Sequence, residues 1–158
     1  CLSVFVIWQI SKTRSLESTF AKLQRKLSSE KGSSQEYYEL GSIYLDKKLY
    51  IQSVGLFQKA LKVDDGIEPE NKALIYNALG YAYFAQEQYD LAIRNYKEAT
   101  KLYPEYVTAL NNLGNVYEKK QMVAKSVETY EQALKVDPKN NIAKRRSESL
   151  RKRLIESN

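Results

Sequence analysis

The sequence predicts an all-α protein in which pairs of helices stack into a solenoid. Three observations predict this fold class. Three segments in the middle of the chain align without gaps, and each contains a Leu-Gly pair, ending at Gly41, Gly80 and Gly114. The last two glycines are 34 residues apart, and the first two are 39 residues apart. Within each segment, small and large apolar residues recur three or four positions apart, which places them on one face of a helix.

The second segment shows the repeated positions most clearly. Gly80 is followed at fixed distances by Tyr83, Ala92, Tyr96 and Ala99, and the other two segments carry similar residues at the same distances. We expect a first helix over about residues 73–86 and a second over about 89–102. The small residues would let the two helices approach closely, and the tyrosine ring would fill the adjoining space.

The 34-residue period is the length of the tetratricopeptide unit, and the sequence resembles the tetratricopeptide repeat (TPR) family over residues 34–140. The repeats are expected at 34–72, 73–106 and 107–140. Pro104 and Pro138 close the second and third repeats, whereas the first has Asp65 at that place and five inserted residues within 64–71. The resemblance implies a right-handed TPR solenoid of three helix-turn-helix repeats.

Residues 1–14 are expected to be the end of a transmembrane anchor. The first ten residues carry no charge, and Trp8, Lys12 and Arg14 follow the pattern of a membrane–water interface. A complete span needs roughly 20 apolar residues, so the favoured interpretation is the C-terminal part of a truncated span. The alternatives are a buried element of the domain and a lipoprotein start acylated on Cys1. Under the favoured interpretation, the basic residues place the repeats in the cytoplasm, stroma or matrix.

Residues 15–33 are expected to form an amphipathic linking helix and a short linker. Leu16, Phe20, Leu23 and Leu27 follow one another at steps of three or four residues. This helix could pack against the first repeat, lie on a membrane surface or pair with a helix of a partner.

Residues 141–158 are expected to form a basic helix that caps the last repeat. Ile142, Leu150 and Leu154 would pack on the repeat, while the basic residues, including Arg145 and Arg146, would remain in solvent. A second interpretation is that this helix binds acidic lipid or an acidic protein.

Composition argues against catalysis and against several kinds of ligand. The chain has no histidine and one cysteine, which removes a disulfide framework within the chain, zinc patterns of His and Cys, and the base of a Ser-His-Asp mechanism. No phosphate-binding loop or nucleic-acid motif accompanies the net charge of +6. We therefore expect no enzyme activity, cofactor, metal site, small-molecule substrate or nucleic-acid partner.

The family resemblance implies a protein-binding groove on the concave side of the repeats. The residues expected to line it are Tyr38, Asn77, Tyr81, Phe84, Asn111, Asn115, Glu118 and Arg145. Asparagine amides can bond the backbone of an extended peptide, and rings can accept an apolar side chain. The Lys/Asn/Lys/Arg clamp of TPR proteins that bind chaperone tails is missing, because Tyr38, Thr108 and Asn112 occupy three of its positions.

A narrower resemblance covers nearly the whole chain. The apolar start, the segment ISKTRSLESTFAKLQRKL and the junction DDGIEPENKALIYNALGYAYF resemble the thylakoid-anchored TPR proteins of cyanobacteria and plastids that assist photosystem I assembly. This resemblance implies a non-enzymatic, membrane-tethered scaffold in the thylakoid, with repeats that face the stroma or cytoplasm and bind photosystem I subunits or assembly intermediates. The alternative is a soluble TPR adaptor that binds a peptide segment of another complex.

Overall fold

The computed structural model describes residues 2–156, so the alternative of a lipoprotein start acylated on Cys1 lies outside the described residues. Within this range the chain forms eight α-helices and no strand, which confirms the all-α fold class. The helices are α1 (Leu2–Ser29), α2 (Ser34–Asp46), α3 (Tyr50–Lys62), α4 (Pro69–Ala85), α5 (Tyr89–Leu102), α6 (Val107–Lys119), α7 (Val123–Val136) and α8 (Asn141–Glu156).

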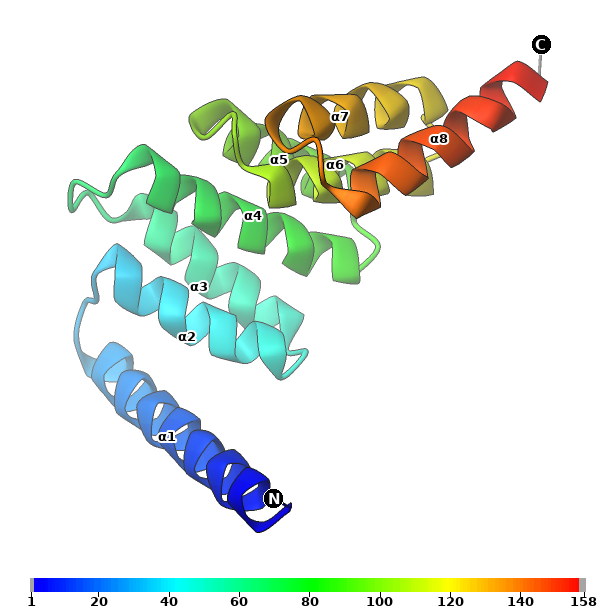
Figure 1. Ribbon diagram of the computed structural model, residues 1–158. Coiled ribbons are helices and arrows are strands. Elements are labelled where there is room, and N and C mark those ends of the chain that lie inside the picture. Colours follow the sequence, from blue (N-terminus) through cyan, green and yellow to red (C-terminus); the bar gives the residue numbers. More distant parts are fainter. Residues whose placement is uncertain (1, 157–158) are drawn as a thin grey trace. The chain divides into compact units, whose positions relative to one another are not determined.

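The helices divide into two compact units, Cys1–Asp65 and Gly66–Asn158. The first unit contains α1, α2 and α3, and α2 packs against both of the other helices (Figure 1). In the second unit, α5 lies against both α4 and α6, α7 lies against α6, and α8 covers α7. The hairpins α2–α3, α4–α5 and α6–α7 correspond to the three predicted repeats.

Glycine permits close helix contact within each hairpin, as the sequence predicts. A Cβ atom at Gly80 would lie 2.7 Å from the ring of Tyr96, and one at Gly114 would lie 2.8 Å from the ring of Tyr130. Both tyrosines are fully buried. A methyl group at either glycine would therefore have to displace the ring that fills the middle of the hairpin.

The helix limits agree with the sequence for α5 but not for α4. Helix α5 spans the predicted residues 89–102, whereas α4 starts at Pro69, four residues before the predicted start at residue 73. Proline is favoured in the first turn of a helix because its fixed φ suits the helix and its missing N–H has no partner there. Part of the inserted segment therefore lengthens α4.

Asp65 links the two ends of the first hairpin. Its carboxylate accepts hydrogen bonds from the backbone N–H and the hydroxyl of Ser34, both at 2.7 Å. These bonds to the ionised form lower the pKa of Asp65, and the backbone bond has the largest effect. Asp65 thus holds the chain after α3 at the N-terminus of α2, in the repeat that lacks a closing proline.

The C-terminal half of α1 packs against α2. Leu23 is buried, the Phe20 ring meets the Tyr44 ring edge-on at a centroid distance of 5.4 Å, and the Gln24 amide donates to the Tyr44 hydroxyl at 3.1 Å. The Lys47 ammonium lies 2.8 Å from the Glu17 carboxylate. Of the three alternatives for this segment, packing against the first repeat is therefore the one that the structure shows.

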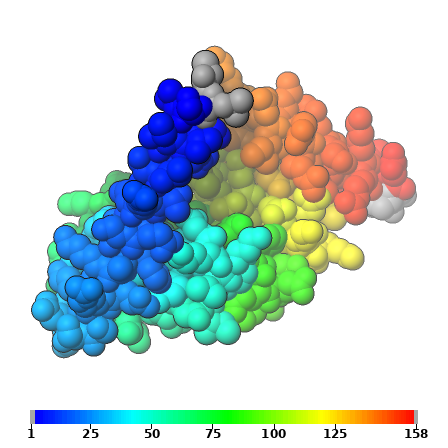
Figure 2. Space-filling view, turned by 90° about the horizontal axis from the view of Figure 1, so that it is seen from below, coloured from blue at the N-terminus to red at the C-terminus, as the bar shows by residue number. Residues whose placement is uncertain are grey.

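The N-terminal half of α1 has no such contacts with its own unit. Figure 2 shows its first turns, in dark blue, extending away from α2 and α3. The large apolar side chains of this half, Val4, Phe5, Val6, Ile7, Trp8 and Ile10, are all exposed, which excludes a buried element within this unit. Across residues 2–156, no helix combines the length and the apolar character that crossing a membrane requires.

Helix α8 covers the last repeat, with one correction to the predicted contacts. Leu150 is buried against α7, and Leu154 packs beside it. Ile142 is 54% exposed, so the expectation that it packs on the repeat is wrong, and Ala143 is buried in its place. The buried stripe of α8 therefore consists of Ala143, Ser147 and Leu150.

Candidate protein-binding surface

Seven of the eight predicted binding residues lie on three helices of the second unit. Helix α4 carries Asn77, Tyr81 and Phe84, α6 carries Asn111, Asn115 and Glu118, and α8 carries Arg145. We call this surface the amide face. The eighth residue, Tyr38, lies on α2 in the first unit, where its ring is 5.9 Å from the ring of Phe57.

Asn77 joins the second and third repeats. Its side-chain N–H donates to the Tyr106 hydroxyl at 3.2 Å, and its carbonyl oxygen accepts from the Asn112 amide at 3.0 Å. A primary amide has two N–H groups and two acceptor lone pairs. Asn77 therefore keeps one donor and one acceptor after these bonds, so it combines a packing role with a remaining capacity to bond a peptide backbone.

Asn111 repeats this arrangement one step along the stack. Its amide donates to the Asn140 side chain at 3.3 Å, and Asn140 in turn accepts from the Ala143 N–H at the start of α8. The Oδ1 atom of Asn111 is buried and has no hydrogen-bond partner. A buried acceptor without a partner is costly, so this atom favours a donor from water or from a bound molecule.

Glu118 fixes α8 to α6. Arg146 donates to both carboxylate oxygens of Glu118, with the Nε atom 3.1 Å from Oε2 and the Nη2 atom paired with Oε1. The Glu118 side chain is only 16% exposed, and the pKa of Arg146 is raised chiefly by this hydrogen bond. The neighbouring Tyr130 is buried, which raises its pKa to about 12. Arg146 is therefore part of the site, although the sequence placed it in solvent.

The remaining residues of the amide face are open to contact. The Tyr81 side chain is 46% exposed, and the Phe84 ring packs against Tyr89 with a centroid distance of 5.6 Å. Asn115 lies at a small hollow of about 270 Å³ together with Glu118, Lys119, Gln121, Arg146 and Arg153. Arg145 is exposed on α8. The surface thus offers amide, aromatic, basic and carboxylate groups.

Sequence reasoning missed three partners of the amide face: Tyr106, Asn140 and Arg146. Tyr106 and Asn140 each precede a helix at the end of a linker. Their positions are a usable signal, because each of these two residues bonds an asparagine 29 positions earlier in the chain. Within residues 2–156, no group of three or more His, Cys, Asp or Glu side chains is arranged to hold a metal ion.

Comparison with known proteins agrees with this architecture. The family model described as tetratricopeptide repeat matches residues 37–66 and, in a second version, 107–140, and a model described as TPR repeat matches residues 80–121. The crystal structure of MamA is similar with a TM-score of 0.79, covering 90% of this chain and 80% of that one at 21% identity. The chain is thus a TPR protein.

Similarity to curated proteins narrows the class. The ycf37 protein of Cyanophora paradoxa is 40% identical over 142 residues, which cover 90% of this chain and 82% of that protein. The chloroplastic TPR protein PYG7 of Arabidopsis thaliana is 36% identical over 150 residues, which cover 95% of this chain and half of that protein. This chain belongs to the ycf37 family of TPR proteins.

Proposed function

We propose that this chain is a non-enzymatic, membrane-tethered TPR scaffold that binds protein subunits and assists the assembly of a membrane complex, photosystem I in the thylakoid. The observation that carries the proposal is the combination, in one member of the ycf37 family, of a helical segment whose large apolar side chains are exposed and a repeat surface with free hydrogen-bonding groups. The first would hold the chain at a membrane, and the second would hold a partner.

The membrane part of the proposal rests on the N-terminal half of α1. Its exposed apolar side chains lie on all sides of the helix and do not form a single stripe. The Lys12 ammonium lies 5.1 Å from the centre of the Trp8 ring. Trp and a following basic residue are the usual anchors of a helix at the lipid–water interface. Removing these side chains from water would stabilise the membrane-bound state by about 1.5–3 kcal/mol for each fully buried residue.

The scaffold part rests on the amide face. Asn77 keeps a free donor and acceptor, the Asn111 Oδ1 atom has no partner, and Tyr81 offers an exposed ring. These groups suit an extended segment of a protein, whose backbone needs hydrogen-bond partners and whose side chains need apolar contacts. Tethering the face at a membrane would raise its effective concentration near a membrane complex under assembly.

The photosystem I part rests on the family. The Arabidopsis relative is chloroplastic, and the sequence resembles the thylakoid-anchored assembly proteins over nearly its whole length. A plastid or cyanobacterial location follows from these relatives, and the thylakoid is the plastid membrane in which a tethered scaffold would meet photosystem I subunits.

Co-purification tests this function. The tagged full-length protein is isolated from mildly solubilised photosynthetic membranes, and the accompanying proteins are identified by mass spectrometry. Photosystem I subunits or assembly intermediates should be enriched. A double change of Tyr81→Ser and Asn115→Ser removes one exposed and one half-buried side chain of the amide face and should reduce this enrichment.

A matched control places the same kind of change on α5. Leu91 and Arg94 are both exposed there, so Leu91→Ser with Arg94→Ser alters solvent-facing side chains outside the amide face. The control variant should retain the partners. Recovery in the soluble fraction with unrelated partners would favour a soluble TPR adaptor, and equal partner loss in both variants would move the site off the amide face.

A further inference from the structure

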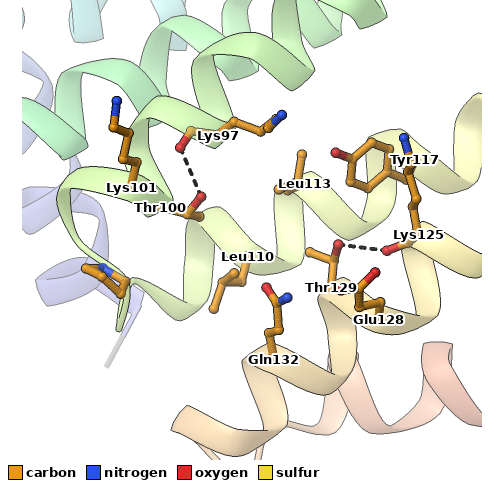
Figure 3. Close-up of a pocket in the computed structure, with 11 residues that line it drawn as sticks. Lys97, Thr100, Lys101, Leu110, Leu113, Tyr117, Lys125, Glu128, Thr129 and Gln132 are labelled. Atoms are coloured by element: carbon orange, nitrogen blue, oxygen red, sulfur yellow. Dashed lines mark hydrogen bonds between the residues drawn. The ribbon is translucent and has the colours of Figure 1, made fainter.

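The second unit also has a hollow that is larger than the one beside Asn115. It is about 450 Å³ in volume and lies among α5, α6 and α7 (Figure 3). We call it the α5–α7 pocket. None of its lining residues belongs to the amide face. Its volume is within the usual range of protein ligand pockets.

The floor of the pocket is apolar and fixed. It is formed by Leu110, Leu113 and Tyr117 of α6, which retain only 4%, 6% and 9% of their exposure. Leu113 and Tyr117 also belong to the apolar core beneath the pocket, and Leu110 belongs to the core under α8. Core packing therefore holds these side chains in place, and the pocket exists before any ligand enters.

The rim of the pocket is cationic. Lys97 and Lys101 extend from α5 and Lys125 extends from α7, so basic residues of both helices line the pocket (Figure 3). The Lys125 ammonium is 6.0 Å from the centre of the Tyr117 ring. Among the described residues, no carboxylate lies within ion-pair distance of any of these three lysines. Glu128 is the single acidic residue that lines the pocket.

Few other donors compete with the lysines. The Thr100 hydroxyl donates to the Lys97 carbonyl at 3.1 Å, and the Thr129 hydroxyl donates to the Lys125 carbonyl at 2.7 Å (Figure 3). Both hydroxyl hydrogens are thus used within their own helices. A ligand in this pocket would meet apolar carbon below, and at the rim the three ammonium groups, the Gln132 amide and the Glu128 carboxylate.

We propose that the α5–α7 pocket is a second docking site, which takes an acidic segment of a partner protein. An apolar side chain of that segment enters the space over Leu113 and Tyr117, and flanking carboxylates pair with Lys97, Lys101 and Lys125. Charge complementarity selects an acidic occupant, because three cations face one carboxylate. The concave shape selects a protein segment over a membrane, because a flat lipid surface reaches the rim but not the floor.

This site would add a second binding surface to the proposed scaffold. It rests on the proposed function in one respect, which is that the chain has a protein partner. The two surfaces share helix α6 but are lined by different residues, so a partner could use one without the other. A scaffold with two sites could hold two segments of one subunit, or two subunits, at the same time.

Fluorescence anisotropy with a defined probe tests the pocket. The probe is a fluorescein-labelled peptide, Glu-Asp-Glu-Leu-Phe-Asp-Glu-Asp, titrated with the full chain. The variant Lys97→Glu with Lys125→Glu should bind the probe at least about tenfold more weakly, because it reverses two of the pairing charges. A probe with Ser-Ser in place of Leu-Phe should also bind at least about tenfold more weakly to the natural sequence.

The matched control is Lys139→Glu with Lys144→Glu. Both lysines are exposed, lie in the same unit outside the pocket, and produce the same change in net charge. This variant should bind the probe within about twofold of the natural sequence, because salt screens the attraction between the probe and charges that lie far from the pocket. Circular dichroism of each variant checks that the helices remain folded, and amide shifts of Leu113 and Thr129 in NMR spectra should respond to the probe.

Four results would overturn the proposal. Equal loss in both variants would indicate general attraction to a basic protein. Unchanged binding by the Lys97→Glu, Lys125→Glu variant, or no binding of the probe by the natural sequence, would exclude the pocket as an acidic-segment site. Loss of binding to phosphatidylglycerol vesicles without any loss of peptide binding would assign the lysines to lipid. Co-purification of photosystem I proteins could still succeed in each case, so failure here leaves the proposed function standing.

Discussion

The two terminal helices carry similar kinds of residue but use them in opposite ways. In α8, Leu150 is 1% exposed and packs with Ala143, Val127 and Tyr130 in the core of the last repeat. In α1, Ile7 is 63% exposed and its apolar neighbours are also in solvent. The difference follows from spacing. The buried residues of α8 recur every three or four positions and form one stripe, whereas residues 4–8 of α1 form a continuous run that no single neighbouring helix can cover.

This comparison teaches that the number of apolar residues in a helix does not decide its role. A helix with a single apolar stripe, such as α8, can cap the last repeat of a stack. Its basic residues, such as Lys144 and Arg145, then remain in solvent. An apolar surface on all sides needs an apolar environment on all sides, which a membrane supplies. The two helices therefore have different roles: α8 stabilises the fold, and the first half of α1 serves the proposed tether.

The largest expected effect contrasts the two helices directly. Leu150→Ala should lower the free energy of unfolding by about 2–4 kcal/mol, because it leaves a cavity in a packed core. Ile7→Ala should change it by less than about 0.5 kcal/mol, because that side chain is already exposed. Urea denaturation followed by circular dichroism measures both. A comparable loss in the two variants would contradict the division of roles.

The next effect tests whether stability resides within the hairpins. Gly80→Ala should destabilise the second unit by about 1–3 kcal/mol, since the new methyl group would lie 2.7 Å from the Tyr96 ring. Gly55→Ala in α3 is the matched control, because nothing lies within 4 Å of a Cβ atom there. The control should be stabilising by about 0.5–1 kcal/mol from helix propensity. Stabilisation by both substitutions would remove the close-contact role of Gly80.

A smaller effect concerns the attachment of the cap. Arg146→Ala breaks the paired hydrogen bonds to Glu118 and should lower the free energy of unfolding by about 1–2 kcal/mol. Arg145→Ala, one residue away in solvent, should stay within about 0.5 kcal/mol of the natural sequence. Differential scanning calorimetry of the two variants measures this. Equal effects would mean that α8 is held by its apolar stripe alone.

The smallest effect is a pH dependence confined to the first hairpin. Folding lowers the pKa of Asp65 from its ordinary value of 3.8, so its contribution to stability is complete above that value. The contribution disappears as pH falls through the lower, folded-state pKa. Glu36, whose pKa is lowered chiefly by its hydrogen bond to Lys26, acts in the same direction.

Asp65→Asn removes this titration while keeping the shape of the side chain. The difference in melting temperature between about pH 6 and about pH 3 should therefore shrink in this variant. Asp64→Asn is the control next to it and should keep the natural pH dependence. An unchanged pH response in Asp65→Asn would show that the bonds to Ser34 do not contribute to acid sensitivity.

Local patterns predicted the repeats well because they depend on short-range spacing. The 34-residue period, the contacts of Gly80 and Gly114 and the limits of α5 all follow from which residues share a helix face. Apolar burial repeats in every hairpin, so each repeat supports the interpretation of the others. The turn between the two helices was not foreseen: Lys48, Glu87 and Gln121 all adopt φ values of 58–59°, at the same place in each repeat.

The candidate sites were less predictable because they depend on helix rotation and on distant contacts. A shift of one residue turns a side chain by about 100° around a helix. Arg145 therefore points into solvent, whereas its neighbour Arg146 bonds Glu118. The hydrogen bonds from Ser34 to the Asp65 carboxylate join residues that are 31 positions apart. The lysines of the α5–α7 pocket come from two helices, and no sequence period places them around one hollow.

The most direct test of the central claim measures membrane binding by α1. The full chain is mixed with vesicles of phosphatidylcholine and phosphatidylglycerol, and the bound fraction is separated by flotation. Ile7→Gln with Trp8→Gln should weaken binding at least about tenfold, because each apolar side chain contributes about 1.5–3 kcal/mol when buried. The control, Ile51→Gln with Ile142→Gln, changes exposed apolar residues elsewhere and should bind as the natural sequence does. Equal binding by all three proteins, or no binding by any of them, would contradict the tether.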